Sequence, residues 1–359
     1  DAIRGYSEKD SVAHVLNSSL TKKEMEQVHA DLRAGLTKLL YVAPESLNKA
    51  SNIELLKEIE ISFFAIDEAH CISEWGHDFR PDYRTIKHSV KALGRKPVIA
   101  LTATATPKVQ ADIIKTMGME EPSIFLSSFN RPNLYYEVRP KRDIDHDIIK
   151  LLSQNIGESA IVYCLSRQKV EDLAEHLQIN GINALPYHAG LESAKRIKHQ
   201  DAFLNEDCDV IVATIAFGMG IDKPDVRFVA HLDMPKNIEG YYQETGRAGR
   251  DGLRADAWMA YGLADVVQQR RMIDESEGDE AYRRASATRL DALLGLCETA
   301  ACRRVRLLDY FGEASAPCGN CDTCLEPPQT FDATQLAQKA LSCIYRTGQR
   351  FGVTHLMDV

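Results

Sequence analysis

The sequence predicts an α/β protein built from two parallel-sheet lobes, followed by a helical region that carries a cysteine cluster. Short apolar runs alternate with amphipathic stretches along most of the chain, which is the pattern of strands and helices in a parallel sheet. Polar residues rarely interrupt the apolar runs, as expected for strands that are covered on both faces. After about residue 266 this pattern gives way to longer helical stretches.

The predicted strands fall into two similar blocks, residues 1–139 and residues 140–265. We interpret each block as one lobe with its own parallel sheet. The apolar runs that predict strands are 39–42, 61–66, 98–101, 161–163, 210–213 and 228–230.

Helices are predicted between these runs. Apolar residues recur at helical spacing from Val170 to Leu177, and an Asn-Gly stop signal follows at 180–181. Another helix is expected to start at Thr106, with that residue as the N-cap and Pro107 in the first turn.

Residues 266–328 are predicted to form a separate helical subdomain. Within it, the segment 281–308 holds six arginines against two acidic residues, a local net charge of +4. Two prolines at 327–328 indicate a linker, and residues 329–359 begin a further element.

The composition excludes several classes of protein. With 44% hydrophobic and 26% charged residues, the 359-residue chain is neither disordered nor collagen-like. The net charge of −9 argues against a wholly basic nucleic-acid coat, although a basic strip can lie within an acidic body. No apolar run approaches the ~18 residues of a membrane span, and no signal-peptide pattern opens the chain. We therefore expect a cytosolic, reduced protein without membrane contact. The nine cysteines are an odd number, so complete internal pairing is impossible.

Two acidic residues, Asp67 and Glu68, directly follow the apolar run 61–66. In parallel α/β sheets, ligands gather beyond the carboxyl ends of the strands. One carboxylate can hold a nucleotide-bound Mg²⁺, and the other can orient or deprotonate an attacking water. The alternative is a solvated strand end without function.

The stretch from Cys71 to Tyr83 reads Cys-Ile-Ser-Glu-Trp-Gly-His-Asp-Phe-Arg-Pro-Asp-Tyr. Together with the preceding Asp-Glu-Ala-His, it resembles the Walker B motif (a DEAH box) and the aromatic-rich loop of RecQ-family DNA helicases. We expect a loop, because a glycine and a proline interrupt the helical spacing. Trp75 and Phe79 can stack on bases, and Arg80 can bind phosphate or stack. Alternatively, the two aromatic residues belong to the core.

Further segments resemble motifs of the same family and follow in its order. They are motif III (101–105), the interlobe linker (129–133), motif IV (163–167), a match at 188–191 and motif V (213–222). The DNA-binding and coupling residues that the resemblance implies are Trp75, His77, Phe79, Arg80, Thr102, Thr104, Ser166, Arg167, His188 and Thr214.

The decapeptide 243–252 resembles motif VI of superfamily 2 helicases. Arg247 and Arg250 are three residues apart, so both can point the same way. An arginine supplied from a second lobe can stabilise charge on a transferring phosphoryl group, an effect worth roughly 10³–10⁵ in rate. The alternative is a surface salt-bridge pair. The resemblance implies as catalytic residues Asp67, Glu68, His70, Gln243, Arg247 and Arg250. It implies as nucleotide-binding residues Asp67, Glu68, Gly218, Asp222, Arg247 and Arg250.

A cysteine cluster follows at Cys318, Cys321 and Cys324, with the spacing C-x₂-C-x₂-C. A fourth thiolate would complete a tetrahedral Zn²⁺ site. Cys302 and Cys297 compete for that place, and the resemblance to the RecQ zinc-binding subdomain favours Cys302.

An iron–sulfur site is the rival interpretation. A bacterial ferredoxin run would place its next cysteine where this chain has Pro328, so that pattern fails. We expect a stabilising zinc site. The cysteines predicted to be free buried thiols are Cys71, Cys164, Cys208 and Cys343.

The chain is thus identified as a member of the RecQ family. The resemblance implies two RecA-like lobes, a helical four-cysteine zinc-binding subdomain and the start of a winged helix. It implies ATP, Mg²⁺ and Zn²⁺ as cofactors and 3′→5′ unwinding of DNA in recombination and repair. Single-stranded and partially duplex DNA would be the partners of a monomeric or weakly associating protein, with a single-strand-binding protein as a further partner. In a bacterium it would be cytoplasmic and associated with the nucleoid.

One expected motif is missing from the sequence. A Walker A loop, G-x-x-x-x-G-K-[ST], wraps phosphates in backbone N–H groups and adds a lysine. The 359 residues contain no such loop. We therefore expect an internal fragment of a longer helicase that hydrolyses ATP poorly or not at all.

Two alternatives remain open. The first is a zinc-bearing DNA-binding module that does not hydrolyse ATP. The second is a superfamily 2 RNA helicase, against which the aromatic-rich loop and the four cysteines count.

Overall fold

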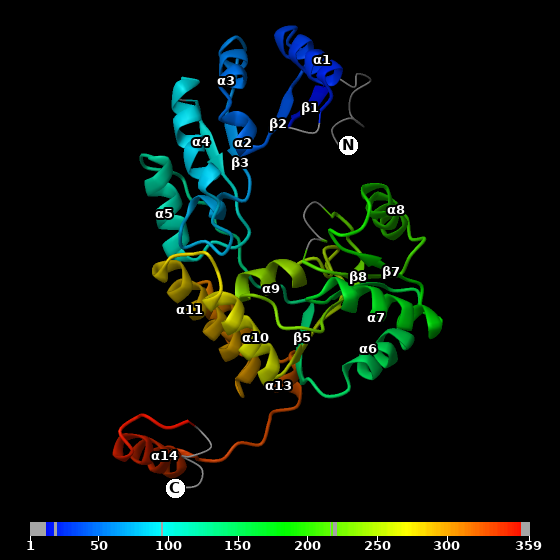
Figure 1. The fold of residues 1–359 in the computed structure, drawn as a ribbon, viewed down its shortest axis with the longest axis vertical. Helices are drawn as coiled ribbons and strands as arrows, with labels where there is room; N and C mark the ends of the chain where they lie inside the picture. The colour runs from blue at the N-terminus through cyan, green and yellow to red at the C-terminus, as the bar shows by residue number, and fades with distance from the viewer. Residues whose placement is uncertain (1–11, 18–19, 95, 216, 218–220, 353–359) are drawn as a thin grey trace.

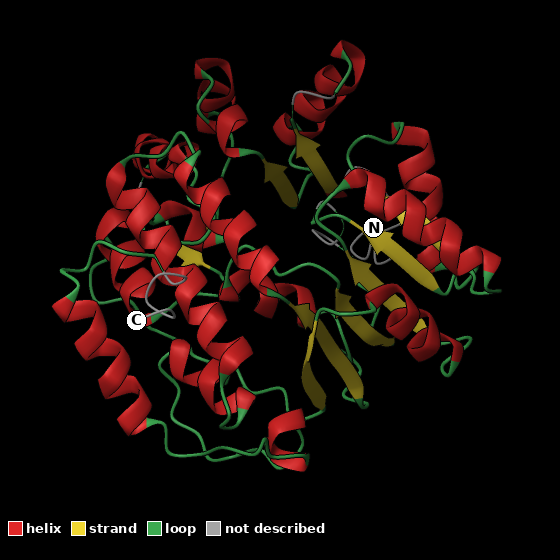
Figure 2. Cartoon of the chain, turned by 60° about the horizontal axis from the view of Figure 1, so that its bottom comes forward, coloured by secondary structure: helices red, strands yellow, loops and turns green. Residues whose placement is uncertain are grey.

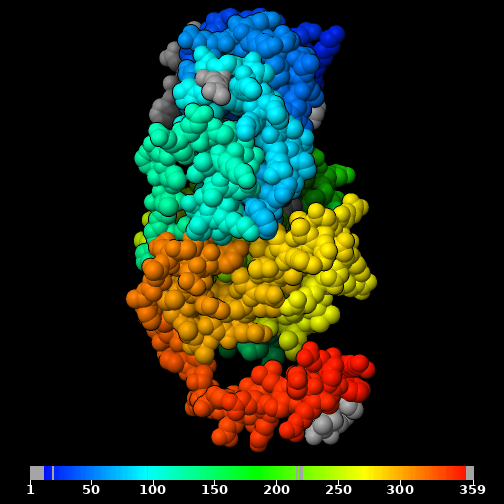
Figure 3. Space-filling view, turned by 90° about the vertical axis from the view of Figure 1, so that its left-hand side faces the viewer, coloured from blue at the N-terminus to red at the C-terminus, as the bar shows by residue number. Residues whose placement is uncertain are grey.

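The computed structural model describes residues 12–17, 20–94, 96–215, 217 and 221–352. It shows two α/β lobes, a helical subdomain and a separate C-terminal helix (Figure 1). In the space-filling view the first lobe lies against the helical subdomain, and the C-terminal helix lies at the far end (Figure 3).

The first lobe contains two small parallel sheets. β1 (Ala13–Leu16) pairs with β2 (Leu39–Val42), and β3 (Phe64–Ile66) pairs with β4 (Val98–Ala100). Its helices are α1 (Lys22–Arg33), α2 (Pro44–Leu47), α3 (Ala50–Lys57), the 3₁₀ helix η3 (Ala69–Ile72), α4 (Pro81–Ala92) and α5 (Pro107–Met117).

The second lobe contains one six-stranded, wholly parallel sheet in the order β5-β10-β9-β6-β8-β7. Its strands are β5 (Leu134–Pro140), β6 (Ser159–Tyr163), β7 (Ala184–Tyr187), β8 (Val210–Ala213), β9 (Val226–His231) and β10 (Ala255–Tyr261). Its helices are α6 (Ile144–Ser153), α7 (Arg167–Ile179), α8 (Ser193–Leu204) and α9 (Ile238–Thr245). In Figure 2 these strands lie between helices. The predicted parallel α/β class is confirmed.

The helical subdomain shares a core with the second lobe. It comprises α10 (Leu263–Asp274), α11 (Glu280–Glu298), α12 (Arg303–Tyr310) and α13 (Asp322–Leu325). On the central strand β6, Ile161 packs in one cluster with Leu290 and Leu293 of α11, while Val162 packs in another with Leu173 of α7. The subdomain therefore covers one face of the sheet, where each buried leucine contributes roughly 1.5–3 kcal/mol.

The last helix, α14 (Thr334–Arg346), has no buried residue among those that the structure describes, so the prediction that Cys343 is a buried thiol is wrong. In the same described part of the chain, no helix combines the length and apolar character needed to cross a membrane.

The structure corrects several expectations. The first-lobe boundary predicted at residue 139 lies before Leu134, because β5 pairs along its whole length with β10 of the second lobe. Four strands have no counterpart in the predicted set, namely β1, β5, β7 and β10. β3 begins at Phe64 rather than at residue 61, and residues 311–317 of the predicted helical subdomain are not helical. Thr106 does stand at an N-cap, but its side chain makes no capping hydrogen bond in the described structure.

Candidate functional site

The acidic pair lies at the carboxyl end of β3, as predicted. Glu68 adopts a left-handed backbone conformation with φ of 49°, which costs free energy for a non-glycine residue. The Asp67 carboxylate accepts a hydrogen bond from the Glu68 backbone N–H at 2.8 Å. Burial, and then the charge of Asp67, raise the pKa of Glu68. This shift favours a carboxylate that can take up a proton.

His70 connects the acidic pair to the neighbouring strand. Its Nδ1 lies 3.0 Å from Thr102 Oγ1 and 3.3 Å from Glu68 Oε2. Its ring stacks on His77 with 4.2 Å between the centroids. Burial lowers the pKa of His70 to about 4 and that of His77 to about 3. Both rings are therefore neutral near pH 7, and they join the β3 end, the segment after β4 and the aromatic-rich loop.

The aromatic-rich loop is partly exposed and is bordered by cations. Trp75 is 43% exposed, and Lys108 Nζ lies 3.1 Å from its ring centroid. The guanidinium carbon of Arg84 lies 5.5 Å from the centroid of the Phe79 ring. Arg80 forms an ion pair with Asp78 at 2.6 Å. The exposure of Trp75 disfavours the alternative that this side chain is core. The loop also ends earlier than predicted, because Pro81 starts α4.

The motif VI residues of the second lobe lie opposite the acidic pair. Gln243 donates a hydrogen bond across the lobes to Thr104 Oγ1 at 3.1 Å. Arg250 pairs with Asp222 at 3.1 Å. The positive charge of Arg247 lowers the pKa of Glu68, against the upward effect of burial. The two lobes are therefore joined by a hydrogen bond, and the charge of Arg247 in one lobe acts on the carboxylate of Glu68 in the other.

Residues of both lobes line a cleft of about 1440 Å³. The predicted site residues that line it are Glu68, Thr102, Asp222, Gln243, Arg247 and Arg250. A volume above the usual 300–1,000 Å³ of ligand pockets leaves ample room for a nucleotide. Glu68 from one lobe and two arginines from the other suit a metal-bound triphosphate, so these residues fit ATP and Mg²⁺, whereas Asp67 and His70 do not line the cleft. Gly218 lies outside the described residues.

The DNA-contacting residues predicted in the second lobe lie at the carboxyl end of its sheet. Ser166, His188 and Thr214 follow β6, β7 and β8, which are neighbours in the sheet, so these residues lie at one edge. Ser166 caps α7 by accepting a hydrogen bond from Lys169 N at 3.2 Å, and Arg167 next to it is exposed. His188 is only 6% exposed. Its Nε2 lies 2.8 Å from Glu171 and its Nδ1 accepts from Gly190 N, so it holds this loop in shape.

The predicted zinc ligands come together. The sulfurs of Cys302, Cys318, Cys321 and Cys324 all lie within 4.8 Å of one another. Tetrahedral Zn²⁺ with Zn–S bonds of ~2.3 Å requires sulfurs about 3.8 Å apart. Distances of 3.4, 3.9 and 3.9 Å between neighbouring sulfurs approach that value, so the donor set fits zinc. Cys297 is buried and lies outside this cluster. The geometry thus favours Cys302 as the fourth ligand.

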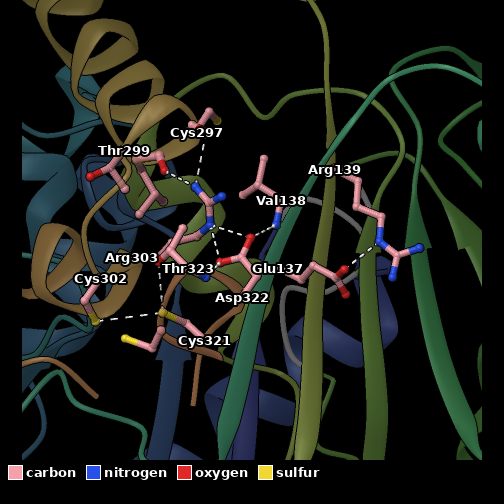
Figure 4. A network of polar contacts seen from close by, with 12 residues as sticks. Glu137, Val138, Arg139, Cys297, Thr299, Cys302, Arg303, Cys321, Asp322 and Thr323 are labelled. Carbon is pink, nitrogen blue, oxygen red and sulfur yellow. Dashed lines mark hydrogen bonds and ion pairs between the residues drawn. The ribbon is translucent and has the colours of Figure 1, made fainter. Parts of the chain in front are cut away.

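A charged network ties the cysteine cluster to the second lobe (Figure 4). Arg303 pairs with Asp322 at 2.6 Å, and the other oxygen of that carboxylate accepts from Val138 N of β5 at 3.0 Å. Arg303 also donates to the carbonyl oxygens of Leu296 and Cys297. Because each partner is satisfied, this largely buried ion pair joins α11, α13 and β5 into one unit.

Sequence reasoning missed several residues of the site. Arg289 of α11 donates to the carbonyl of Trp75 at 3.1 Å and so reaches the aromatic-rich loop. Arg131 and Glu313 hold the interlobe linker. Arg131 stood within a recognised segment, but no local signal gave its role, because its partners lie more than a hundred residues away in sequence.

Comparison with known families matches nearly the whole chain. The matching family models are DEAD/DEAH box helicase (residues 3–113), Helicase conserved C-terminal domain (143–252), RecQ zinc-binding (263–325) and RQC domain (327–359). Relatives named ATP-dependent DNA helicase RecQ are 45% identical in Pasteurella multocida and 44% in Haemophilus influenzae, each over 97% of this chain. A third, from Bacillus subtilis, is 40% identical over 100% of this chain.

The chain belongs to the RecQ family of superfamily 2 helicases. It spans about half the length of the first relatives, covering 55% of the Pasteurella protein, 56% of the Haemophilus protein and 61% of the Bacillus protein.

Solved structures share the two-lobed fold. The DUF1998 helicase MrfA bound to DNA superposes with a TM-score of 0.58 at 17% identity, covering 75% of this chain and 39% of that one. Dbp5 of S. cerevisiae bound to RNA and ADP BeF3 gives 0.55 at 15% identity, covering 80% and 75%. At these identities the likeness supports the RecA-like fold alone.

Proposed function

We propose that the full-length protein containing these residues is an ATP-dependent DNA helicase of the RecQ type. It would translocate 3′→5′ and act in recombination and repair, in the compartment that holds the chromosome. The observation that carries the proposal is the interlobe cleft, which is lined by Glu68 on one side and by Arg247 and Arg250 on the other. Its support from sequence is the 45% identity to a RecQ helicase over 97% of the chain.

The residues divide the chemistry between the lobes. Asp67 would hold Mg²⁺, and Glu68, with its raised pKa, would orient and deprotonate the attacking water. Arg247 and Arg250 would neutralise the charge that develops on the phosphoryl group. Gln243 contacts Thr104 across the cleft, so a change of nucleotide state could move one lobe relative to the other. Hydrolysis of bound ATP would supply the free energy for this movement.

Single-stranded DNA would pass the aromatic-rich loop and the edge formed by Ser166, Arg167 and Thr214. Trp75 offers an exposed face for stacking, and base–aromatic stacking contributes roughly 1–3 kcal/mol per base. Because stacking needs little net charge, a chain with a net charge of −9 can still bind DNA in this way. A monomeric state and a single-strand-binding protein as partner remain predictions of the family resemblance.

The test is the hydrolysis of ATP by the full-length protein with single-stranded DNA or RNA as activator. Stimulation by DNA, lost in Arg247→Ala, is the expected result. Stimulation by RNA alone would identify an RNA helicase instead.

A second candidate is a zinc-bearing DNA-binding module without hydrolysis, which the four-cysteine cluster and the exposed Trp75 would serve. We propose that the 359-residue chain by itself does not hydrolyse ATP. Phosphate release from the purified chain that DNA stimulates and Glu68→Gln abolishes would contradict this. A full-length protein that binds DNA but shows no such hydrolysis would support the module.

A further inference from the structure

The interlobe linker, residues 129–133, and Ser128 directly before it are held from two sides. On one side they contact the segment between the first and third cysteine ligands, and on the other they contact the motif VI loop. We propose that the zinc-closed segment 302–321 acts as a clamp on this linker and thereby positions Arg247, with Glu313 as the main positioning residue of the clamp.

Glu313 makes the most specific contacts of the clamp. Its Oε1 accepts a hydrogen bond from Ser128 Oγ at 2.6 Å, and its Oε2 accepts one from the backbone N–H of Phe129 at 2.7 Å. Phe311, two residues earlier, stacks on the Phe129 ring with a centroid distance of 4.4 Å and an interplanar angle of 6°. A carboxylate can satisfy both donors at once, because each oxygen accepts separately.

Two more residues of the same segment continue the contact along the linker. Arg304 is 5% exposed and donates to Asn130 Oδ1 at 3.1 Å and to the carbonyl of Leu134. Asn320 Nδ2 donates to the carbonyl of Pro132 at 3.0 Å. The clamp therefore follows the linker from its start to the first residue of β5.

The opposite side of the linker fixes the backbone around Arg247. Arg131 donates to the carbonyl oxygens on both sides of that residue, Gly246 at 3.2 Å and Ala248 at 2.9 Å. Asn133 Nδ2 donates to the carbonyl of Gly249 at 2.9 Å. A Cβ at Gly249 would lie 2.5 Å from that same Nδ2, and φ is +56°, so this close approach requires glycine.

The metal ligands close the segment that supplies the clamp. Arg304, Phe311, Glu313 and Asn320 all lie between Cys302 and Cys321 in the sequence. Zinc joins the ends of this segment into a short loop, which removes most of its conformational freedom. A purely local structural metal would stabilise the helical subdomain alone. The clamp predicts that the metal also stabilises the linker and the motif VI loop.

The direct test is amide hydrogen exchange of the zinc-loaded 359-residue chain. Glu313→Gln keeps the side-chain size but replaces one acceptor with a donor. Exchange is expected to accelerate by roughly tenfold or more at residues 128–134, because a hydrogen bond to a charged acceptor is lost there. The acceleration should be smaller at residues 246–253. Strands β6 and β8 should keep their protection, and the zinc content should stay at one per chain.

The matched control is Asp309→Asn, the same chemical change at an exposed residue of α12 that belongs to the same closed segment. It should leave linker exchange unchanged. The proposal is overturned if Glu313→Gln leaves the linker protected, if both variants behave alike, or if exchange rises across the whole second lobe together with loss of zinc.

A catalytic readout rests on the proposed function. In the full-length protein, Glu313→Gln should lower kcat by about tenfold while changing the KM for ATP little, because a misplaced arginine acts in the transition state. Glu313→Ala should lower it at least as much, and Asp309→Asn should not. An equal fall in kcat for Glu313→Gln and Asp309→Asn would contradict the clamp. If the wild-type protein hydrolyses no ATP, the proposed function fails, while the hydrogen-exchange result still tests the clamp.

Discussion

The two lobes use the same sequence pattern but bury their strands to different degrees. Ile161 of β6 has neighbouring strands on both sides and is 0% exposed. Ile99 of β4 pairs with β3 alone among the described strands and is 47% exposed. Tyr41 and Phe63 of the first lobe are likewise more than half exposed.

An apolar run therefore specifies a strand, whereas its burial depends on neighbouring strands at both edges and helices on both faces. The second lobe has both, and the helical subdomain adds to its core. The arginines of the cleft therefore stand on the better packed lobe, and the carboxylates stand on the more exposed one. Variants in each lobe test this contrast.

Loss of zinc should act on the second lobe and its subdomain. Cys321→Ser removes a thiolate ligand, and structural zinc contributes roughly 10–16 kcal/mol of apparent binding free energy to folding. Zinc content should fall to near zero, with loss of helical circular dichroism from the subdomain. Cys297→Ala should keep one zinc, because that sulfur lies outside the cluster. Loss of zinc in the second variant but not in the first would reverse the ligand assignment.

Truncating one isoleucine in each lobe compares their cores directly. Ile161→Ala is expected to lower the free energy of unfolding by about 2–5 kcal/mol, the usual cost of such a cavity. Ile99→Ala should cost less than ~1 kcal/mol, because the side chain is already half in water. Urea denaturation of both variants is the measurement. Equal losses would show that the first-lobe sheet is as well packed as the second.

Acid should weaken the first lobe through its buried histidines. The folded pKa of His70, about 4, lies below the ordinary 6.5, so its stabilisation is complete above pH 6.5 and is lost as pH falls towards 4. Between pH 7 and pH 5, His70 and His77 should each lower the free energy of unfolding by about 2 kcal/mol. Urea denaturation at both pH values should show a smaller pH effect in the double variant His70→Gln/His77→Gln.

The raised pKa of Glu68 acts with the opposite sign, so the difference between variant and wild type is the decisive quantity. A double variant as acid-sensitive as the wild type would contradict the assignment of neutral histidines.

Surface ion pairs should contribute little in either lobe. Arg33→Ala breaks an exposed pair with Glu58, and Arg254→Ala breaks one with Asp256. Each should change the free energy of unfolding by less than ~1 kcal/mol, because solvent screens both charges. A large effect in one lobe would mean that surface charge, and not burial, separates the two.

The sequence predicted the parallel class, the two lobes and the position of each motif, because these depend on local pattern. It missed β5 and β10, whose polar and small residues, such as Glu137 and Ala257, break up the apolar signal. It predicted the residues of the cleft one motif at a time, and their common cavity became evident from tertiary structure. The contact between Glu313 and Phe129 joins residues 184 positions apart, which no local signal can reveal.

We propose that Glu68 and Arg247 act together in one interlobe cleft. A double-mutant cycle on DNA-stimulated ATP hydrolysis by the full-length protein tests it, with Glu68→Gln and Arg247→Ala alone and combined. If the two residues act on the same transition state, the double variant should be little slower than the slower single variant. Rate losses that multiply, as expected for two independent sites, would show that Glu68 and Arg247 do not act together.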